Sequence, residues 1–246
     1  MNTMPERARR GALKRCTFFG FSLLISGLTW AAVAANPEPN TLSAEEKAAG
    51  WRLLFDGKTT QGWRGFKKKD FPTTGWVVED GWLKKAAKQR GGDIITVDKF
   101  SDFELHWEWR IPPKANNGIK YMIIEERGAI GHEYQMIDDN VVRGGKGKTA
   151  SFYDVLPPKD HQPLKFAPDS NLSRLLVQGN HVEHWLNGEK VLEYECGSKE
   201  VLDAVAKSKF KNVKDFGLKV TGPILLTDHT DEASFRNLKI RELPPK

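Results

Sequence analysis

The segment Gly131–Asp139 gathers side chains suited to acid–base chemistry. It runs Gly-His-Glu-Tyr-Gln-Met-Ile-Asp-Asp. Side chains alternate along a strand, so one face of an ideal strand would carry Glu133, Gln135 and Asp139. We expect Glu133 to act as a general base or acid, with Asp138 beside it if a bulge breaks the alternation. The alternative is structural: Glu133 in a salt bridge, and Asp138 and Asp139 in a solvated turn.

Lys120 is the candidate for a positive charge at the same site. Lys120 lies in Asn-Gly-Ile-Lys-Tyr and, on a strand, faces away from the apolar Ile119 and Tyr121. It can supply positive charge to the same site, or it can be an ordinary surface lysine, as most lysines are.

Other polar residues are weaker candidates for binding. Alternation from Phe103 to Ile111 puts four ionisable side chains on one face, among them His106 and Glu108. These side chains would lie beside Glu133 if their strand and the strand of Glu133 share a sheet; otherwise their face is solvated. Arg143 lies in a glycine-rich loop that could cover a substrate. The other candidates are Tyr153, with core packing as its alternative, and the Asp228–His229 pair, with a loop-bracing hydrogen bond as its alternative. We expect His184 to be a buried structural histidine.

The elements that must position these residues are mainly strands. Period-two patterns cover Phe103–Ile111, Leu172–Val177, His181–Leu186 and Lys190–Tyr194, with turns at Gly-Asn and Asn-Gly pairs. Further strands are expected at Trp76–Val78, Trp82–Leu83, Ile224–Thr227 and Ala233–Ile240, and helices after Ser43 and Ser198. The pattern predicts an all-β fold, a two-sheet antiparallel sandwich with one or two short helices.

The N-terminus resembles a secretory signal peptide. Residues 1–35 combine a basic start, an apolar run and a small-residue stretch, Ala-Ala-Val-Ala-Ala. We therefore expect cleavage and a periplasmic or secreted protein with no stable membrane span; the alternative is an uncleaved anchor. A linker and short helix at 36–49 would precede one domain at 50–243.

Removing that segment changes the charge argument. The whole chain of 246 residues has a net charge of +6, but residues 1–35 hold five of its 38 basic and one of its 32 acidic residues. The remaining 211 residues carry only about +2, so nucleic acid is not expected as a partner. Only two cysteines occur, and Cys196 alone would remain after cleavage, which excludes a disulfide scaffold.

From Trp51 onward the chain resembles the 3-keto-disaccharide hydrolase domain family. The blocks that carry the resemblance are Leu54–Lys58 with Gly62–Trp63, Trp76–Gly81, Asp102–Leu105, Asn117–Tyr121, Gly131–Asp139, Tyr153–Asp154, Val182–Gly188, Ser208–Phe210, Leu226–His229 and Phe235–Ile240. One departure is Thr-Asp-His-Thr at 227–230, where many relatives have Gln-Asp-His-Gly.

The resemblance implies a jelly roll like that of concanavalin A and a sugar substrate oxidised to a ketone at carbon 3 by an upstream oxidoreductase. A base then removes the acidified C2 hydrogen, the C1–O bond breaks by elimination, and water adds. Such a site needs a base, an acid and a cation for the enolate. We expect Glu133, Lys120 and Asp138 to be catalytic, and the other candidates above to bind substrate.

Two other functions are considered: a carbohydrate-binding module without catalysis, and an ordinary glycosidase. No dedicated metal-ligand spacing occurs in the sequence. We therefore expect no metal site and no cofactor, although a divalent metal that chelates the ketone stays a minor hypothesis.

Overall fold

The computed structural model describes residues 38–246. The predicted signal peptide lies outside these residues. In the described part, no helix is both long and apolar enough to span a membrane.

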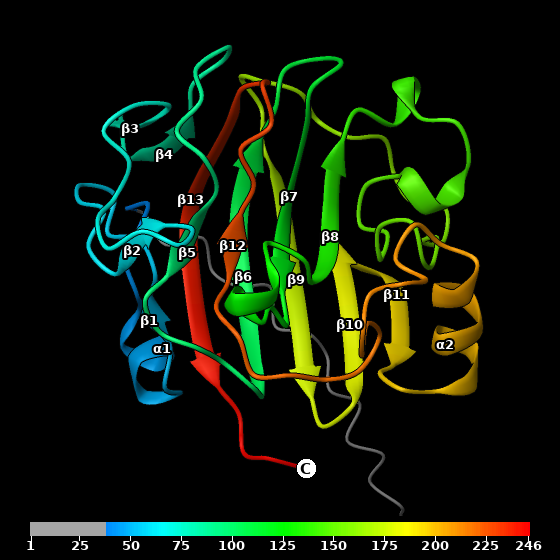
Figure 1. The fold of residues 1–246 in the computed structure, drawn as a ribbon. Helices are drawn as coiled ribbons and strands as arrows, with labels where there is room; N and C mark the ends of the chain where they lie inside the picture. The colour runs from blue at the N-terminus through cyan, green and yellow to red at the C-terminus, as the bar shows by residue number, and fades with distance from the viewer. Residues whose placement is uncertain (1–37) are drawn as a thin grey trace, which may run out of the picture. The chain divides into compact units, whose positions relative to one another are not determined.

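Two antiparallel sheets face each other (Figure 1). The larger one contains, in spatial order, β11 (Glu189–Glu195), β10 (His181–Leu186), β9 (Asn171–Gln178), β6 (Phe103–Arg110), β13 (Ala233–Glu242), β4 (Trp82–Lys85) and β3 (Trp76–Glu79), with β1 (Arg52–Leu53) on β13. The smaller one contains β2 (Trp63–Gly65), β5 (Ile94–Thr96), β12 (Leu225–Leu226), β7 (Asn116–Tyr121) and β8 (His132–Ile137). This arrangement confirms the predicted sandwich.

The apolar core lies between the sheets. On β6, Phe103, Leu105, Trp107 and Trp109 are buried in it, as the alternation predicts. Across from them, Tyr134 of β8 meets Trp107 edge to face, with ring centroids 4.8 Å apart. Burial of such large aromatic side chains provides the main stabilisation of a sandwich without disulfides.

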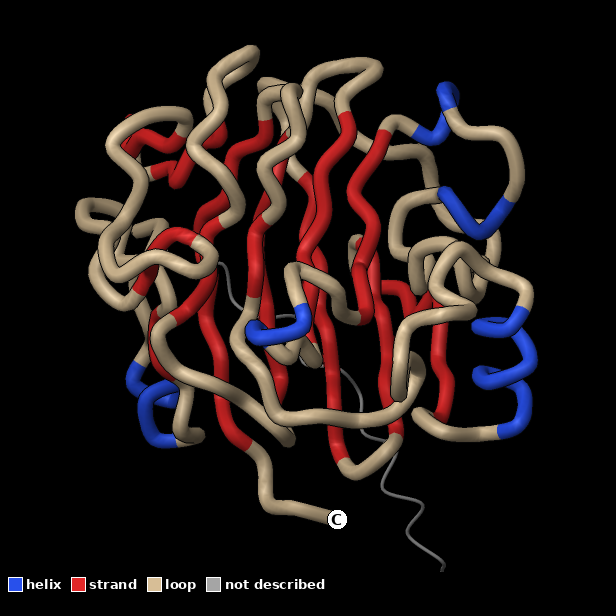
Figure 2. The backbone as a smooth tube through the Cα atoms, viewed as in Figure 1, coloured by secondary structure: helices blue, strands red, loops and turns tan. Residues whose placement is uncertain are grey.

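Short helices and turns connect the strands (Figure 2). α1 (Ala44–Ala48) begins with the predicted capping box, in which Ser43 and Glu46 bond each other's backbone N–H. α2 (Lys199–Ala206) is capped by Ser198. Three 3-10 turns complete the set: η1 (Glu125–Arg127), η2 (Asp139–Val141) and η3 (Gly145–Gly147).

A loop segment extends the smaller sheet beyond β8. Phe152 forms a bridge to Tyr134, and the Tyr153 N–H donates to the Glu133 carbonyl at 3.1 Å. Phe152 is fully buried in the core. Alternation therefore turns Tyr153 to the outer face, on the same side as Glu133.

Candidate active site

The outer face of the five-stranded sheet carries a row of ionisable side chains. We call it the Glu133 face. Lys120 and Glu133 are cross-strand partners on β7 and β8, and side chains of such partners lie on the same side. Their neighbours Ile119 and Tyr134 point into the core instead. The opposite facing of Lys120 and Ile119 confirms the sequence prediction.

Glu133 is buried but unpaired. Its side chain is 5% exposed, and no residue in the described part of the chain forms a hydrogen bond or an ion pair with its carboxyl group. Burial raises the pKa of Glu133, and Asp93 adds to the rise, while Lys120 and Lys209 act in the opposite direction. A carboxylate with a raised pKa is a stronger base than an ordinary one.

A glycine makes room for this carboxyl group. A Cβ atom at Gly118 would lie 2.4 Å from Oε1 of Glu133. Gly118 is the cross-strand partner of Gln135, whose Nε2 donates to Oδ1 of Asn116 at 3.2 Å, while its Oε1 has no partner among the described residues. The absence of a side chain at position 118 lets Glu133 fold back over the sheet.

His229 and Asp93 lie on the far side of Lys120 from Glu133. His229 follows β12, the neighbour of β7, and Asp93 precedes β5. Burial lowers the pKa of His229, as does the charge of Lys120, against the opposite effect of Asp93. The structure thus brings the predicted His229 toward the Lys120–Glu133 pair, in surroundings that lower its pKa.

Tyr153 and Lys209 form the other flank of Glu133. The ammonium of Lys209 lies 3.9 Å from the centre of the Tyr153 ring, within the range of a cation–π interaction. Sequence reasoning proposed Tyr153 but missed Lys209 and Asp93 as site residues. The only signal for Lys209 was its place in the Ser-Lys-Phe block.

A buried hydrogen-bond chain supports the strands beneath the site. The Ala150 carbonyl can only accept, so His184 donates from Nδ1 (2.8 Å) and its Nε2 accepts from Tyr121 (2.6 Å). Tyr121 in turn accepts from Tyr194, which accepts from Nδ1 of His132, each at 2.8 Å. Burial lowers the pKa of His132 to about 3 and that of His184 to about 4. This confirms the expected structural role of His184.

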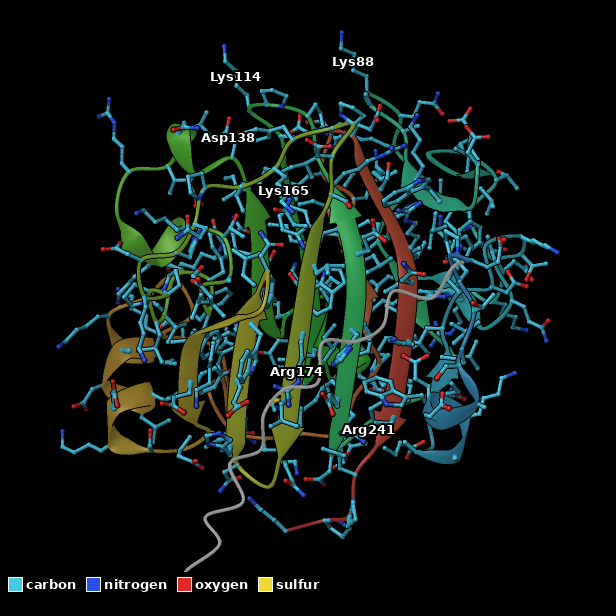
Figure 3. All side chains as sticks on the ribbon, turned by 180° about the vertical axis from the view of Figure 1, so that it is seen from behind. Lys88, Lys114, Asp138, Lys165, Arg174 and Arg241 are labelled. Atoms are coloured by element: carbon cyan, nitrogen blue, oxygen red, sulfur yellow. The ribbon has the colours of Figure 1, made fainter. Side chains whose placement is uncertain are left out.

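Asp138 lies in a different environment. It caps η2: Oδ1 accepts from the Asn140 N–H at 2.9 Å and Oδ2 from the Lys114 N–H at 2.8 Å. Burial alone would raise the pKa of Asp138, but these hydrogen bonds lower it. Figure 3 shows Asp138 and Lys114 at one end of the sandwich. The structure therefore places Asp138 in a turn at the end of the strand and not beside Glu133. This turn is the expected alternative in its position, but Asp138 is buried there and not solvated.

Asp139 and Arg143 also lie beyond the end of β8. Asp139 accepts from the Thr149 N–H at 2.7 Å and pairs with His161 at 3.3 Å, in a crevice that Lys148 also lines. The predicted facing of Asp139 with Glu133 fails because β8 ends at Ile137. Arg143 is exposed in the loop between η2 and η3.

Glu108 and His106 are on the opposite outer face. Their strand, β6, pairs with β9 and β13 in the eight-stranded sheet, so it does not share a sheet with Glu133. Glu108 accepts two hydrogen bonds from Arg236 (2.7 and 2.8 Å), and His106 bonds Glu104 at 2.9 Å. The expectation that these residues join Glu133 is not met.

Asp228 braces the loop before His229. It forms a 2.9 Å ion pair with the fully buried Lys85, and its Oδ2 accepts from the N–H groups of Gly91 and Gly92 at 2.8 and 2.7 Å. Asp228 thus holds two loops together and fixes the start of the segment that carries His229.

One group of side chains has the spacing of metal ligands. Ligand atoms of His181, Glu183 and Glu193 lie within 4.8 Å of one another on β10 and β11. Lys190 already donates to Glu183 at 3.2 Å and to Glu193 at 2.5 Å. Within residues 38–246 this is the only such group of three, and it lies in the sheet opposite to Glu133.

Comparison with known proteins identifies the family. The model of the 3-keto-alpha-glucoside-1,2-lyase-like domain matches residues 50–241. The chain belongs to this family. It is 32% identical to the 3-keto-disaccharide hydrolase of Bacteroides thetaiotaomicron, over 84% of this chain and 83% of that protein. The resemblance predicted from the sequence is therefore confirmed.

Solved structures agree on the fold. A proposed glycosyl hydrolase from Parabacteroides distasonis is 32% identical, with a TM-score of 0.74, over 84% of this chain and all of that one. A second from the same organism is 24% identical, with a TM-score of 0.63, over 78% and 99% of the two chains. The second likeness concerns the fold alone.

Proposed function

We propose that this protein cleaves 3-keto-glycosides by removing the C2 hydrogen. The observation that carries the proposal is the buried, unpaired Glu133 beside Lys120. Membership of the family and the name of the Bacteroides relative, 3-keto-disaccharide hydrolase, support the substrate class. The same proposal includes export, as the N-terminal sequence predicts, and an upstream oxidoreductase that makes the ketone.

The roles follow from the order of groups on the sheet. Glu133, as the carboxylate, takes the proton from C2. The electron pair then moves toward the C3 oxygen, where the ammonium of Lys120 stabilises the enolate. Collapse of the enolate restores the ketone, forms the C1=C2 bond and expels the glycosidic oxygen. Water then adds at C1 while C2 regains a proton, so the net reaction is hydrolysis.

An ordinary glycosidase needs a different arrangement. It places two carboxyl groups on either side of the glycosidic bond. Here the neighbours of Glu133 along the sheet are Lys120 on one side and Tyr153 on the other. Lys120 and Tyr153 favour proton abstraction over that mechanism. A binding module, in turn, has no use for a buried carboxyl group without a partner.

The test is incubation of the purified protein with 3-keto-trehalose and with unoxidised trehalose. Release of 3-keto-glucose from the first and no cleavage of the second is expected. Cleavage of trehalose itself would indicate an ordinary glycosidase, and binding without any cleavage would indicate a binding module. A parallel incubation with a chelator tests the minor metal hypothesis.

A further inference from the structure

Lys209 is an exposed residue at the edge of the Glu133 face whose backbone is anchored by several contacts. Its N–H donates to Oδ2 of Asp154 at 2.7 Å. The hydroxyl of Ser208, the residue before Lys209, accepts from the N–H of Phe210, the residue after it, at 3.0 Å. The Phe210 ring stacks on Phe216, with ring centroids 4.1 Å apart. These contacts fix the backbone from which the Lys209 side chain reaches over Tyr153.

The ammonium of Lys209 has unused donors. Among residues 38–246 it meets no acceptor and no carboxylate; it contacts only aromatic rings, that of Tyr153 at 3.9 Å and that of Phe210 at 5.0 Å. Tyr153 lies directly beside Glu133, because its N–H donates to the Glu133 carbonyl. Lys209 also acts electrostatically on Glu133. Lys209 is thus a charged donor near the place where a substrate of Glu133 would lie.

Glu133 therefore lies between two cations. Across the sheet the order is Lys120, Glu133, and then Tyr153 with Lys209. A 3-keto-glycoside has the matching order of reacting groups: the C3 oxygen, the C2 hydrogen and the glycosidic oxygen on C1. In this order, Lys120 is placed for the C3 oxygen, Glu133 for the C2 hydrogen and Lys209 for the glycosidic oxygen.

We propose that Lys209 is the general acid that protonates the departing glycosidic oxygen. This inference rests on the proposed function and deepens it. As the C1–O bond breaks, an N–H proton of Lys209 passes to the leaving oxygen, and its electron pair stays on the nitrogen. In the second half, the neutral amine takes a proton from the water that adds to C1, while Glu133 returns its proton to C2. Both residues end as they began.

The test separates C2 deprotonation from bond cleavage. The substrates are methyl and 4-nitrophenyl 3-keto-glucoside in D₂O, with NMR detection of deuterium at C2 and of each released alcohol. The variants are K209M, K209R and, as a control in the same turn, K211M. Arginine keeps the charge but does not give up a proton, so K209R distinguishes an acid from a merely positive group.

We expect K209M and K209R to release methanol about 100-fold more slowly or worse, as loss of a general acid predicts. Both should release 4-nitrophenol, a good leaving group, within about 10-fold of the wild-type rate. Deuterium should enter C2 at nearly the wild-type rate in both, and K211M should match the wild type in all three measurements.

Three results would overturn the assignment. The first is release of methanol by K209M at the wild-type rate. The second is release of methanol by K209R at the wild-type rate, which would show that only charge is needed. The third is a loss of deuterium exchange and of 4-nitrophenol release in K209M as large as its loss of methanol release. A wild type that cleaves neither substrate would instead overturn the proposed function, and the role of Lys209 with it.

Discussion

The two outer faces of the sandwich carry buried carboxylates in opposite electrostatic states. We call the outer face of the eight-stranded sheet the Glu104 face. Glu104 on β6 is bonded by Arg241 at 2.9 Å, by Arg174, and by His106 at 2.9 Å; Figure 3 shows Arg174 and Arg241 over this sheet. Although burial acts to raise it, these partners hold the pKa of Glu104 well below its ordinary value.

Glu133 has no such partners, and its pKa is raised. The two residues, Glu104 and Glu133, are about equally buried, at 4% and 5% exposure, so residue exposure alone does not distinguish them. The difference is the presence or absence of paired charges. Paired carboxylates brace a fold, whereas an unpaired one costs stability and is retained where chemistry needs it.

The largest expected effect is on turnover in E133Q. Glutamine keeps the shape of the side chain but cannot take the C2 proton. Cleavage of 3-keto-trehalose should fall by roughly 10²–10⁴-fold, the usual contribution of a general base. Steady-state kinetics with E104Q as the matched control measures this. Equal losses of turnover per folded molecule in E133Q and E104Q would contradict the distinction between a catalytic Glu133 and a structural Glu104.

G118A should displace Glu133 without unfolding the protein. The new Cβ would lie 2.4 Å from Oε1, which is the end of a flexible side chain and can move. A shift of about 1 Å in a catalytic group can cost about 100-fold in rate. We expect a fall in kcat of up to this size with little change in Tm. A normal kcat would show that Glu133 does not need its present position.

E104Q should mainly affect stability. It leaves the guanidinium groups of Arg174 and Arg241 facing a neutral amide. Breaking a buried ion pair costs about 3–5 kcal/mol, and we expect the lower end because the Arg241 side chain is 34% exposed. Urea unfolding of E104Q beside the wild type gives the value. An unchanged midpoint would show that the Glu104 network contributes nothing to the fold.

The pH dependence of stability should have opposite signs on the two faces. A raised folded-state pKa means that Glu133 weakens the fold as pH rises through that pKa, so E133Q should be more stable than wild type at neutral pH and equal in acid. The lowered pKa of Glu104 means a contribution lost as pH falls, so the deficit of E104Q should shrink in acid. Thermal melts from pH 2 to 8 test both, because the contribution of Glu104 is lost only below its ordinary pKa of 4.5; parallel curves would contradict the account.

The smallest effect is expected for R143A. Arg143 is exposed in the loop between η2 and η3. Cleavage rates should stay within about twofold of wild type and stability within about 0.5 kcal/mol, as for most surface substitutions. A tenfold loss of kcat/KM would show that the loop between η2 and η3 reaches the substrate.

Sequence patterns predicted local structure better than sheet membership. Alternation correctly placed Lys120 opposite Ile119, and the positive φ angles of Asn187 (48°) and Gly188 (93°) confirm the predicted hairpin turn. The same alternation identified the polar face that contains Glu108 but could not assign it to a sheet. Which strands pair depends on contacts far apart in sequence, which periodicity does not encode.

The site itself was predicted in part. Alternation along each strand predicted that the side chains of Glu133 and Lys120 point away from the core. Because their strands are adjacent in one sheet, the two side chains also lie on the same face. Asp138 was misplaced because a strand pattern does not show where the strand ends and a capped turn begins. Lys209 and Asp93 lie in loops that only the tertiary fold brings toward Glu133; no local pattern marks Asp93, and the Ser-Lys-Phe block marks Lys209 without giving it a role.

The most direct test of the central claim follows hydrogen exchange at C2 without any bond cleavage. The 3-keto derivative of 1,5-anhydroglucitol has the acidic C2 hydrogen but no leaving group. In D₂O, the wild type and E104Q should both exchange this hydrogen for deuterium at the same rate, and E133Q should not exchange it above the buffer rate. Unimpaired exchange in E133Q, or none in the wild type, would contradict the account of Glu133 as the base.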